Sequence, residues 1–270
     1  QGFEVDIAPV DEKGFVDVRV LASLIRPDTI LVSIMAVNNE IGSIQPIEAI
    51  SELLADKPTI SFHVDAVQAL AKIPTEKYLT NRVDFATFSS HKFHGVRGVG
   101  FVYIKSGKRI MPLLTGGGQE GDYRSTTENV AGIAATAKAL RLAMEKLDLF
   151  TAKTSQMKAV IRQALLDYSD IFVFSDEDDF APHILTFGIK GVRGEVIVHA
   201  FEDYDIFIST TSACSSKAGK PAGTLIAMGV DKDKAQSAVR LSLDLENDMS
   251  QVEQFLTKLK LIYNQTRKVR

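Results

Sequence analysis

Short apolar runs alternate with amphipathic segments through the first half of the chain. Four runs rich in β-branched residues have the length of strands, and a helical pattern begins at Pro46 and continues through residues 47–57. A shorter helix is expected from Ala66. Because apolar strands separated by helices are typical of buried parallel strands, we expect a mainly parallel sheet covered on both faces. The expected strands are residues 29–37, 59–64, 83–88 and 98–104.

The pattern changes at residue 129, where long amphipathic helices replace the short apolar runs. Shorter strands interleaved with helices follow, which predicts a smaller α+β domain. We therefore expect two domains, an α/β domain over residues 1–149 and a smaller domain over residues 150–270. The expected helices are 129–147, 151–169, 194–203, 221–229 and 250–264, and the expected strands are 171–175, 183–189 and 205–210.

The composition narrows the class of protein. A chain of 270 residues with 45% hydrophobic and 24% charged residues is ordinary for a soluble globular protein. A net charge of −3 gives no reason to expect direct binding to nucleic acid, and no apolar stretch has the length of a membrane span. Without a signal peptide the expected compartment is the cytoplasm. The single cysteine excludes an intramolecular disulfide and a multi-cysteine metal site, so no metal site is predicted.

Polar side chains cluster where the predicted strands end, which is where ligands bind in parallel α/β sheets. Taken alone, these residues are weak evidence. Asn39 could be a turn residue, Asp65 a helix cap and His91 a turn histidine. Together they provide a carboxylate that needs a cation and a lysine flanked by small hydroxyl groups. Pyridoxal phosphate (PLP) requires both features. The cluster consists of Asn38, Asn39, Glu40, Asp65, Gln68, Ser89, Ser90, His91 and Lys92.

A glycine-rich stretch, residues 115–129, adds an arginine and two threonines just before a long predicted helix. Glycines allow close approach of the backbone, and hydroxyl groups near a helix N-terminus can bind phosphate. An exposed loop that caps the helix is an equally good interpretation of this stretch taken alone.

Six motifs occur in the order and spacing of the cysteine desulfurases, which belong to the class V aminotransferase group of fold-type I PLP enzymes. The sequence resembles this family from its first residues to about residue 260. The resemblance implies an α/β fold of type I, with a PLP-binding large domain over residues 1–149 and a small domain carrying a cysteine loop over residues 150–270. The motifs are "VNNEIGSIQPI", "HVDAVQALAKIP", "SSHKFHG", "GGGQE…RSTTEN", "SACSS" and "AVRLSL".

The resemblance assigns cofactor roles by position. It implies that Lys92 forms the Schiff base with PLP, and that Asp65 pairs with the pyridinium nitrogen and keeps the ring an electron sink. Gln68 and Asn39 match residues that hydrogen-bond the phenolate oxygen, and Asn39 also borders the substrate. The phosphate-binding positions correspond to Ser89, His91 and Thr127. Because the family takes the threonine from the partner subunit, the resemblance also implies a homodimer.

Two further residues match substrate and sulfur positions. Arg240 matches the arginine that binds the substrate carboxylate, whereas its sequence alone favours a partly exposed arginine at a strand start. Cys214 lies among small polar residues that suit an exposed loop, although a lone cysteine is more often a buried hydrophobe. In the family this cysteine attacks the sulfur of PLP-bound L-cysteine and gives alanine and an enzyme persulfide. The persulfide passes to an acceptor protein, either an iron–sulfur scaffold or a tRNA-thiolation enzyme.

The chain departs from the family at two places. The family often has Arg-Ser-Gly-Thr where this chain reads Arg124-Ser125-Thr126-Thr127. Full-length members also carry roughly a hundred residues before the equivalent of Gln1, so we expect an N-terminally incomplete chain. Two alternatives therefore stay open: a related class V aminotransferase or selenocysteine lyase that does not use Cys214, and a truncated, non-catalytic dimerisation module.

Overall fold

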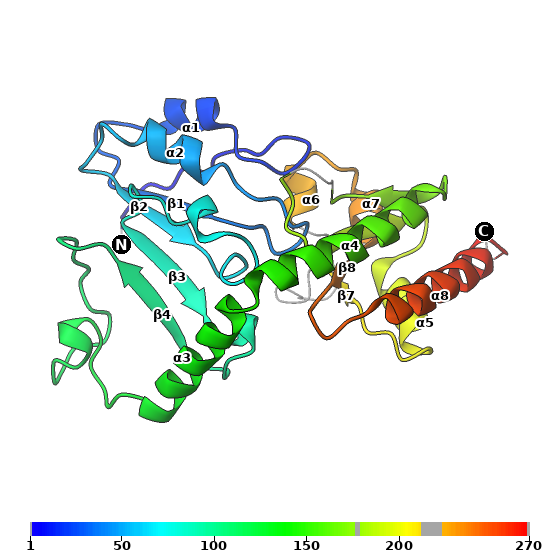
Figure 1. Ribbon diagram of the computed structural model, residues 1–270. Helices are drawn as coiled ribbons and strands as arrows, with labels where there is room; N and C mark the ends of the chain where they lie inside the picture. Colours follow the sequence, from blue (N-terminus) through cyan, green and yellow to red (C-terminus); the bar gives the residue numbers. More distant parts are fainter. Residues whose placement is uncertain (1, 176–178, 212–222, 269–270) are drawn as a thin grey trace. The chain divides into compact units, whose positions relative to one another are not determined.

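The computed structural model describes residues 2–175, 179–211 and 223–268, and the chain forms two compact units (Figure 1). One unit contains Gln1–Arg26, Val37–Pro46 and Asp148–Arg270, and the other contains Pro27–Ala36 and Ile47–Leu147. We call them the C-terminal unit and the sheet unit. The predicted boundary at residue 150 lies close to the point where the chain leaves the sheet unit. The assignment of a PLP-binding domain and a cysteine-loop domain to the two ranges stays a prediction.

The sheet unit is built on four strands in the order β1-β2-β3-β4. Strands β1 (Leu31–Met35), β2 (Ser61–Asp65) and β3 (Phe85–Ser89) are parallel, and β4 (Gly100–Ile104) runs antiparallel to β3. All four expected strands of the first half are therefore present, and the sheet is mainly parallel as predicted.

The two faces of this sheet differ. One face is apolar and buried, with Phe62, Val64, Ala86 and Phe88 on the central strands. On the other face alternate residues include Ser33, His63 and Thr87, and the described structure covers this face only in part: Leu31 at the β1 edge is 52% exposed. The prediction that both faces are covered is therefore wrong for the described residues. This face mixes polar residues with apolar ones such as Met35 and Phe85, which are 40% and 9% exposed.

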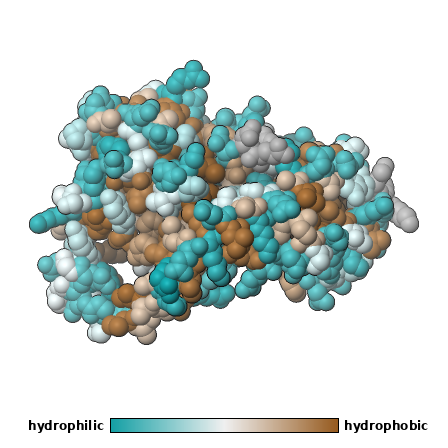
Figure 2. Space-filling view, in the orientation of Figure 1, coloured by the Kyte–Doolittle hydropathy of each residue, from teal (hydrophilic) through white to brown (hydrophobic). Residues whose placement is uncertain are grey.

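The helices of the sheet unit are α2 (Ile47–Leu53), α3 (Val130–Met144) and the 3₁₀ turns η1 (Thr75–Lys77), η2 (Ser90–Phe93) and η3 (Glu120–Asp122). Helix α3 is capped by Asn129, whose side chain accepts a hydrogen bond from the Gly132 N–H at 3.0 Å. This cap agrees with the helix-capping interpretation of the stretch before it. Apolar atoms are exposed over the start of α3 (Figure 2).

The short helix expected from Ala66 is replaced by consecutive turns. The Leu70 N–H bonds to the Ala66 carbonyl, which is a single helical turn, but Ala71 adopts a left-handed conformation with φ of 57°. A left-handed residue cannot continue a right-handed helix, and Pro74 lies three residues on. The prediction failed because the left-handed Ala71 and the nearby Pro74 stop the helix after one turn.

The C-terminal unit has an antiparallel sheet of order β5-β6-β8-β7. Its strands are β5 (Ile171–Val173), β6 (Ile184–Ile189), β7 (Ser209–Thr210) and β8 (Ala238–Ser242). The expected strand at 205–210 is thus only two residues long. The helices are α1 (Val18–Leu24), α4 (Leu147–Leu166), α5 (Gly194–Glu202), α6 (Gly223–Ala227), α7 (Lys232–Gln236) and α8 (Met249–Lys268). Helices α1 and α7 were not predicted, although Asp17 and Asp231 cap them.

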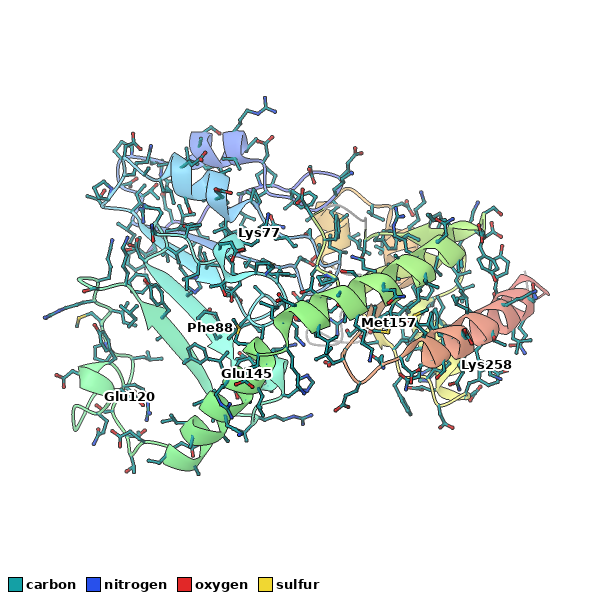
Figure 3. The ribbon with its side chains drawn as sticks, in the orientation of Figure 1. Lys77, Phe88, Glu120, Glu145, Met157 and Lys258 are labelled. Carbon is teal, nitrogen blue, oxygen red and sulfur yellow. The ribbon has the colours of Figure 1, made fainter. Side chains whose placement is uncertain are left out.

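The core of the C-terminal unit contains side chains from α4, α5, α8 and the sheet. Met157 of α4, labelled in Figure 3, is 1% exposed. Phe201 of α5 stacks on Phe255 of α8 with 4.9 Å between ring centroids, and both belong to this core. The two long helices expected at 129–147 and 151–169 are present as α3 and α4, and α4 packs in this core. In the described ranges, no helix has both the length and the apolarity needed to cross a membrane.

Candidate active site

The carboxyl edge of the sheet unit brings together several of the predicted site residues. Asp65 is the last residue of β2 and Ser89 is the last residue of β3. Asp65 and Thr87 are register partners on adjacent parallel strands, so the two strands end at the same edge. The turn η2 follows β3 directly and carries His91 and Lys92 to this edge. The sequence prediction that these residues lie at neighbouring strand ends is correct.

The backbone around Lys92 is fixed by close packing. The Oγ of the buried Ser90 accepts a hydrogen bond of 2.9 Å from the Thr136 hydroxyl of α3, and the Ser90 carbonyl accepts the Gly95 N–H at 2.9 Å. A Cβ at Gly95 would lie 1.9 Å from Ser90 Oγ, so only glycine fits there. His94 ends the turn in the left-handed conformation, with φ of 65°. The motif therefore sets the position of Lys92, while His94 ends the turn through its left-handed backbone conformation.

Lys92 is half-buried, and its amine makes no hydrogen bond or ion pair with any described residue. Ser89 is also half-buried, and its hydroxyl caps no backbone N–H of η2. His91 is exposed. An amine that has no described partner is suited to bind an anion or to react as a nucleophile.

Asp65 uses one carboxylate oxygen locally. Its Oδ1 accepts a hydrogen bond from the Val67 N–H at 3.0 Å, which agrees with a capping role. Its other oxygen has no hydrogen bond in the described part of the chain, and Asp65 is half-buried. Gln68 follows in the turn and is also half-buried. Asp65 can therefore cap its turn and still present an oxygen to a ligand.

His63 belongs to the same strand face as Asp65, and sequence reasoning did not assign it a role. One ring nitrogen, Nδ1, lies 2.8 Å from Ser33 Oγ on β1, and the other, Nε2, lies 3.1 Å from Thr87 Oγ1 on β3. Burial lowers the pKa of His63, and the nearby Asp65 charge opposes that shift. The imidazole thus joins three parallel strands through its two ring nitrogens. Its signal in the sequence was a histidine two positions before an aspartate in a strand.

The glycine-rich stretch leaves Thr127 exposed. The side chain of Arg124 donates to the Thr126 carbonyl at 3.2 Å and to its hydroxyl, and pairs with Glu120 at 3.1 Å. Thr126 has a φ of 137°, in a region that L-residues with a branched Cβ rarely adopt. This is the position where the family often has glycine. The phosphate-binding role of Thr127 stays a prediction.

The C-terminal unit brings Asn39 and Arg240 together. Arg240 lies on β8, and its Nη1 donates to the Asn39 carbonyl at 2.8 Å. Asn38 Oδ1 accepts the N–H groups of Glu40 and Ile41 at 2.8 and 2.9 Å, which folds the turn that carries Asn39. The half-buried Arg240 therefore supports the backbone of another predicted site residue. Cys214 lies outside the described residues.

No cluster of His, Cys, Asp and Glu side chains in the described ranges could hold a metal ion.

The Aminotransferase class-V family matches residues 1–255 of the chain. A NifS/IcsS protein homolog of Lactobacillus delbrueckii subsp. bulgaricus is 50% identical over 269 residues, which cover 99% of this chain and 70% of the relative. The cysteine desulfurase IscS of Clostridium botulinum is 39% identical and is covered to 68% by this whole chain.

Solved structures agree with these relatives. A NifS-like protein superposes with a TM-score of 0.88 at 37% identity, covering 97% of this chain and 69% of the other. DndA from Streptomyces lividans superposes with a TM-score of 0.75 at 28% identity, covering 90% of this chain and 68% of the other. The chain therefore belongs to the class-V aminotransferase family, as a homologue of cysteine desulfurases and NifS-like proteins with the fold of type I PLP-dependent enzymes.

Proposed function

We propose that this chain uses PLP to convert L-cysteine to L-alanine and holds the removed sulfur as a persulfide on Cys214. The observation that carries the proposal is the carboxyl edge of the sheet unit, where Lys92 has no described partner and Asp65 offers an unused oxygen. Family membership and relatives named cysteine desulfurase give this edge its chemistry.

The donor set at this edge fits PLP. Lys92 supplies an amine for the aldehyde, and Asp65 supplies a carboxylate that would keep the ring nitrogen protonated. The Ser89 hydroxyl and the His91 ring could hold the phosphate, with Thr127 as a further ligand. When bound, the cofactor supplies an electron sink for the bonds that break at the amino acid.

The chain's own residues would divide the remaining work. Arg240 would bind the substrate carboxylate, for which a planar guanidinium is well suited, and Asn39 would border the substrate. The Lys92 amine would move the proton at the substrate Cα as a general base. Cys214 Sγ would form a bond to the substrate sulfur while the Cβ–S bond breaks. The electron pair of that bond stays with Cβ, which takes up a proton and becomes the methyl group of alanine.

Exposed apolar side chains in the sheet unit support a homodimer. Met111 is 91% exposed and Leu113 94%, and Val130 at the start of α3 is 71% exposed. These residues flank the stretch that contains the exposed Thr127. A second copy that covers this apolar surface would bring the partner's hydroxyl ligands to a phosphate, as the family resemblance implies.

Cofactor attachment to Lys92 tests the proposal. Purified chain with added PLP should show an absorbance band that borohydride removes, and mass spectrometry should then find the reduced cofactor on the peptide that contains Lys92. Lys92→Ala should lose the band. Lys77→Ala, which changes an exposed lysine of the same unit (Figure 3), should keep it. A wild-type chain without this band would contradict the proposal and favour a non-catalytic dimerisation module.

Replacing Cys214 separates the desulfurase from a related lyase. Cys214→Ala should keep the cofactor band and lose persulfide formation from L-cysteine. Since Cys214 is the only cysteine, no other thiol can carry the sulfur. Desulfuration that continues in Cys214→Ala would favour the selenocysteine lyase alternative. The acceptor of the sulfur, an iron–sulfur scaffold or a tRNA-thiolation enzyme, and the cytoplasmic location remain predictions.

A further inference from the structure

The turn that carries Asn39 is held through four consecutive carbonyl groups. The Asn39 carbonyl accepts from Arg240 Nη1 at 2.8 Å. The carbonyls of Glu40, Ile41 and Gly42 accept in turn from Thr186 Oγ1 at 2.5 Å, Ser175 Oγ at 2.6 Å and the Ala181 N–H at 2.7 Å. Such complete pairing of a turn fixes its backbone, so the side chains of Asn39 and Glu40 leave the turn in set directions.

Glu40 is a half-buried carboxylate that the proposed mechanism does not use. Its Oε2 accepts the backbone N–H of Thr224 at 3.2 Å, and Asn38 Nδ2 donates to the Thr224 hydroxyl at 3.2 Å. Thr224 belongs to α6, so two neighbouring side chains of the turn bind the same residue of that helix. Glu40 therefore joins α6 to the turn that Arg240 also contacts.

The charge on Glu40 acts on Arg240. Burial is the largest influence on the pKa of Glu40 and raises it overall. The side-chain and backbone hydrogen bonds with Thr224 lower it in part, and the charge of Arg240, whose Nη1 binds the carbonyl of the neighbouring Asn39, lowers it least. Thr186 and Thr224, which contact the turn from β6 and α6, carry no charge. The guanidinium that would bind a substrate carboxylate thus already has a carboxylate in its field.

We propose that Glu40 is a positioning residue that ties α6 to the Arg240-bound turn, and that its negative charge limits how tightly Arg240 binds the substrate carboxylate. The inference rests on the proposed function, because it takes Arg240 as the carboxylate-binding group. It has a definite sign: removing the charge while keeping the hydrogen bond tightens substrate binding.

Glu40→Gln makes this change, since the amide oxygen can still accept the Thr224 N–H. The KM for L-cysteine and the dissociation constant of the product L-alanine should each fall about two- to fivefold, which is the range for one partly screened charge at this depth. The matched control is Glu246→Gln, which removes an exposed carboxylate from the same unit and should leave both constants unchanged.

The pH profile gives a readout that a purely structural role would not change. In the wild-type chain the dissociation constant of L-alanine should rise as pH rises through the pKa of Glu40, because ionisation adds a negative charge near Arg240. The ammonium and carboxylate of L-alanine stay charged over this range. Glu40→Gln should lose this rise, and Glu40→Asp should restore part of it.

Thr224→Val tests the positioning half of the proposal. It removes the hydroxyl that Asn38 binds and keeps the charge of Glu40, so kcat/KM should fall severalfold with the pH profile retained. A wild-type chain that neither binds PLP nor removes sulfur would overturn the proposed function and this inference together. A working wild-type chain with unchanged constants in Glu40→Gln, or weaker binding there, would overturn this inference alone.

Discussion

Two carboxylates at opposite ends of the sheet unit's parallel strands have opposite surroundings. Asp84, at the amino end of β3, is 2% exposed and accepts from the Phe62 N–H at 2.9 Å, from Arg82 at 2.7 Å and from Lys108 at 3.3 Å. Asp65, at the carboxyl end of β2, is half-buried and accepts one backbone N–H. A buried carboxylate that meets two cations supports structure, whereas one that meets no cation, at an edge that also carries an unpaired amine, can bind a ligand.

Arg82 pairs with Asp84 at the amino end of the sheet unit's parallel strands. Its guanidinium pairs with Asp84 and also donates to the carbonyls of Leu54, Lys57 and Ile60. Arg82→Ala leaves a buried carboxylate with fewer partners, so the free energy of unfolding should fall by about 3 kcal/mol. Urea denaturation measures this value. Arg97→Ala, an exposed arginine of the same unit, should change it by less than about 0.5 kcal/mol.

Lowering the pH should weaken the same network of Asp84, Arg82 and Lys108. Burial alone would raise the pKa of Asp84, but the Phe62 N–H and the charges of Arg82 and Lys108 lower it overall. Because the folded state then holds the proton more weakly than the unfolded state, this stabilisation is present above the unfolded pKa. It is lost as pH falls through the folded pKa. An acid titration in which the wild type and Arg82→Ala lose stability in parallel would contradict the assigned role.

Asp65→Asn should do the opposite of Arg82→Ala: it should hardly change stability but should weaken cofactor binding. The amide oxygen can still accept the Val67 N–H, so the free energy of unfolding should change by less than about 0.5 kcal/mol. Cofactor affinity should fall about tenfold to a hundredfold, because a neutral amide cannot make the charged hydrogen bond to a protonated ring nitrogen. Absorbance titration with PLP measures the affinity. A variant that unfolds easily but binds PLP normally would reverse the roles of the two carboxylates.

His63 lies on the same strand face as Asp65, but both of its ring nitrogens have partners, the hydroxyl groups of Ser33 and Thr87. It is therefore intermediate between the fixed Asp84 and the ligand-binding Asp65. Burial lowers its pKa, so the unfolded state takes up a proton first as pH falls. The stability linked to His63 is therefore present above the unfolded pKa and is lost on acidification through the window below it. His63→Gln should lower the free energy of unfolding at neutral pH by about 1 kcal/mol and should remove this acid-sensitive part. NMR titration of the imidazole in the cofactor-free chain measures the pKa directly, and an ordinary or raised value would contradict the account.

The sequence predicted which residues lie at the carboxyl edge better than it predicted the contacts that support them. The placement of Lys92, Asp65 and Ser89 at strand ends was predictable because polar residues follow apolar runs, and that pattern is local. The pairing of Glu40 with Thr224 joins residues 184 positions apart, and that of Arg240 with Asn39 joins residues 201 apart. No periodicity records such contacts. The turn after Asp65 was missed because Ala71 adopts a left-handed conformation that its residue type does not signal.

Thr126→Gly should have the smallest of these effects, and it should raise the free energy of unfolding instead of lowering it. The φ of 137° strains a β-branched residue, and glycine adopts this conformation without a Cβ clash. The lost hydrogen bond from Arg124 is exposed and contributes little, and the extra freedom of glycine in the unfolded chain offsets part of the gain. The free energy of unfolding should therefore rise by about 0.5–1 kcal/mol. Thr127→Gly is the matched control, because Thr127 has no positive φ, and it should lower stability. If both substitutions destabilise the chain equally, Thr126 is not strained, and the departure from the family's glycine has no energetic consequence.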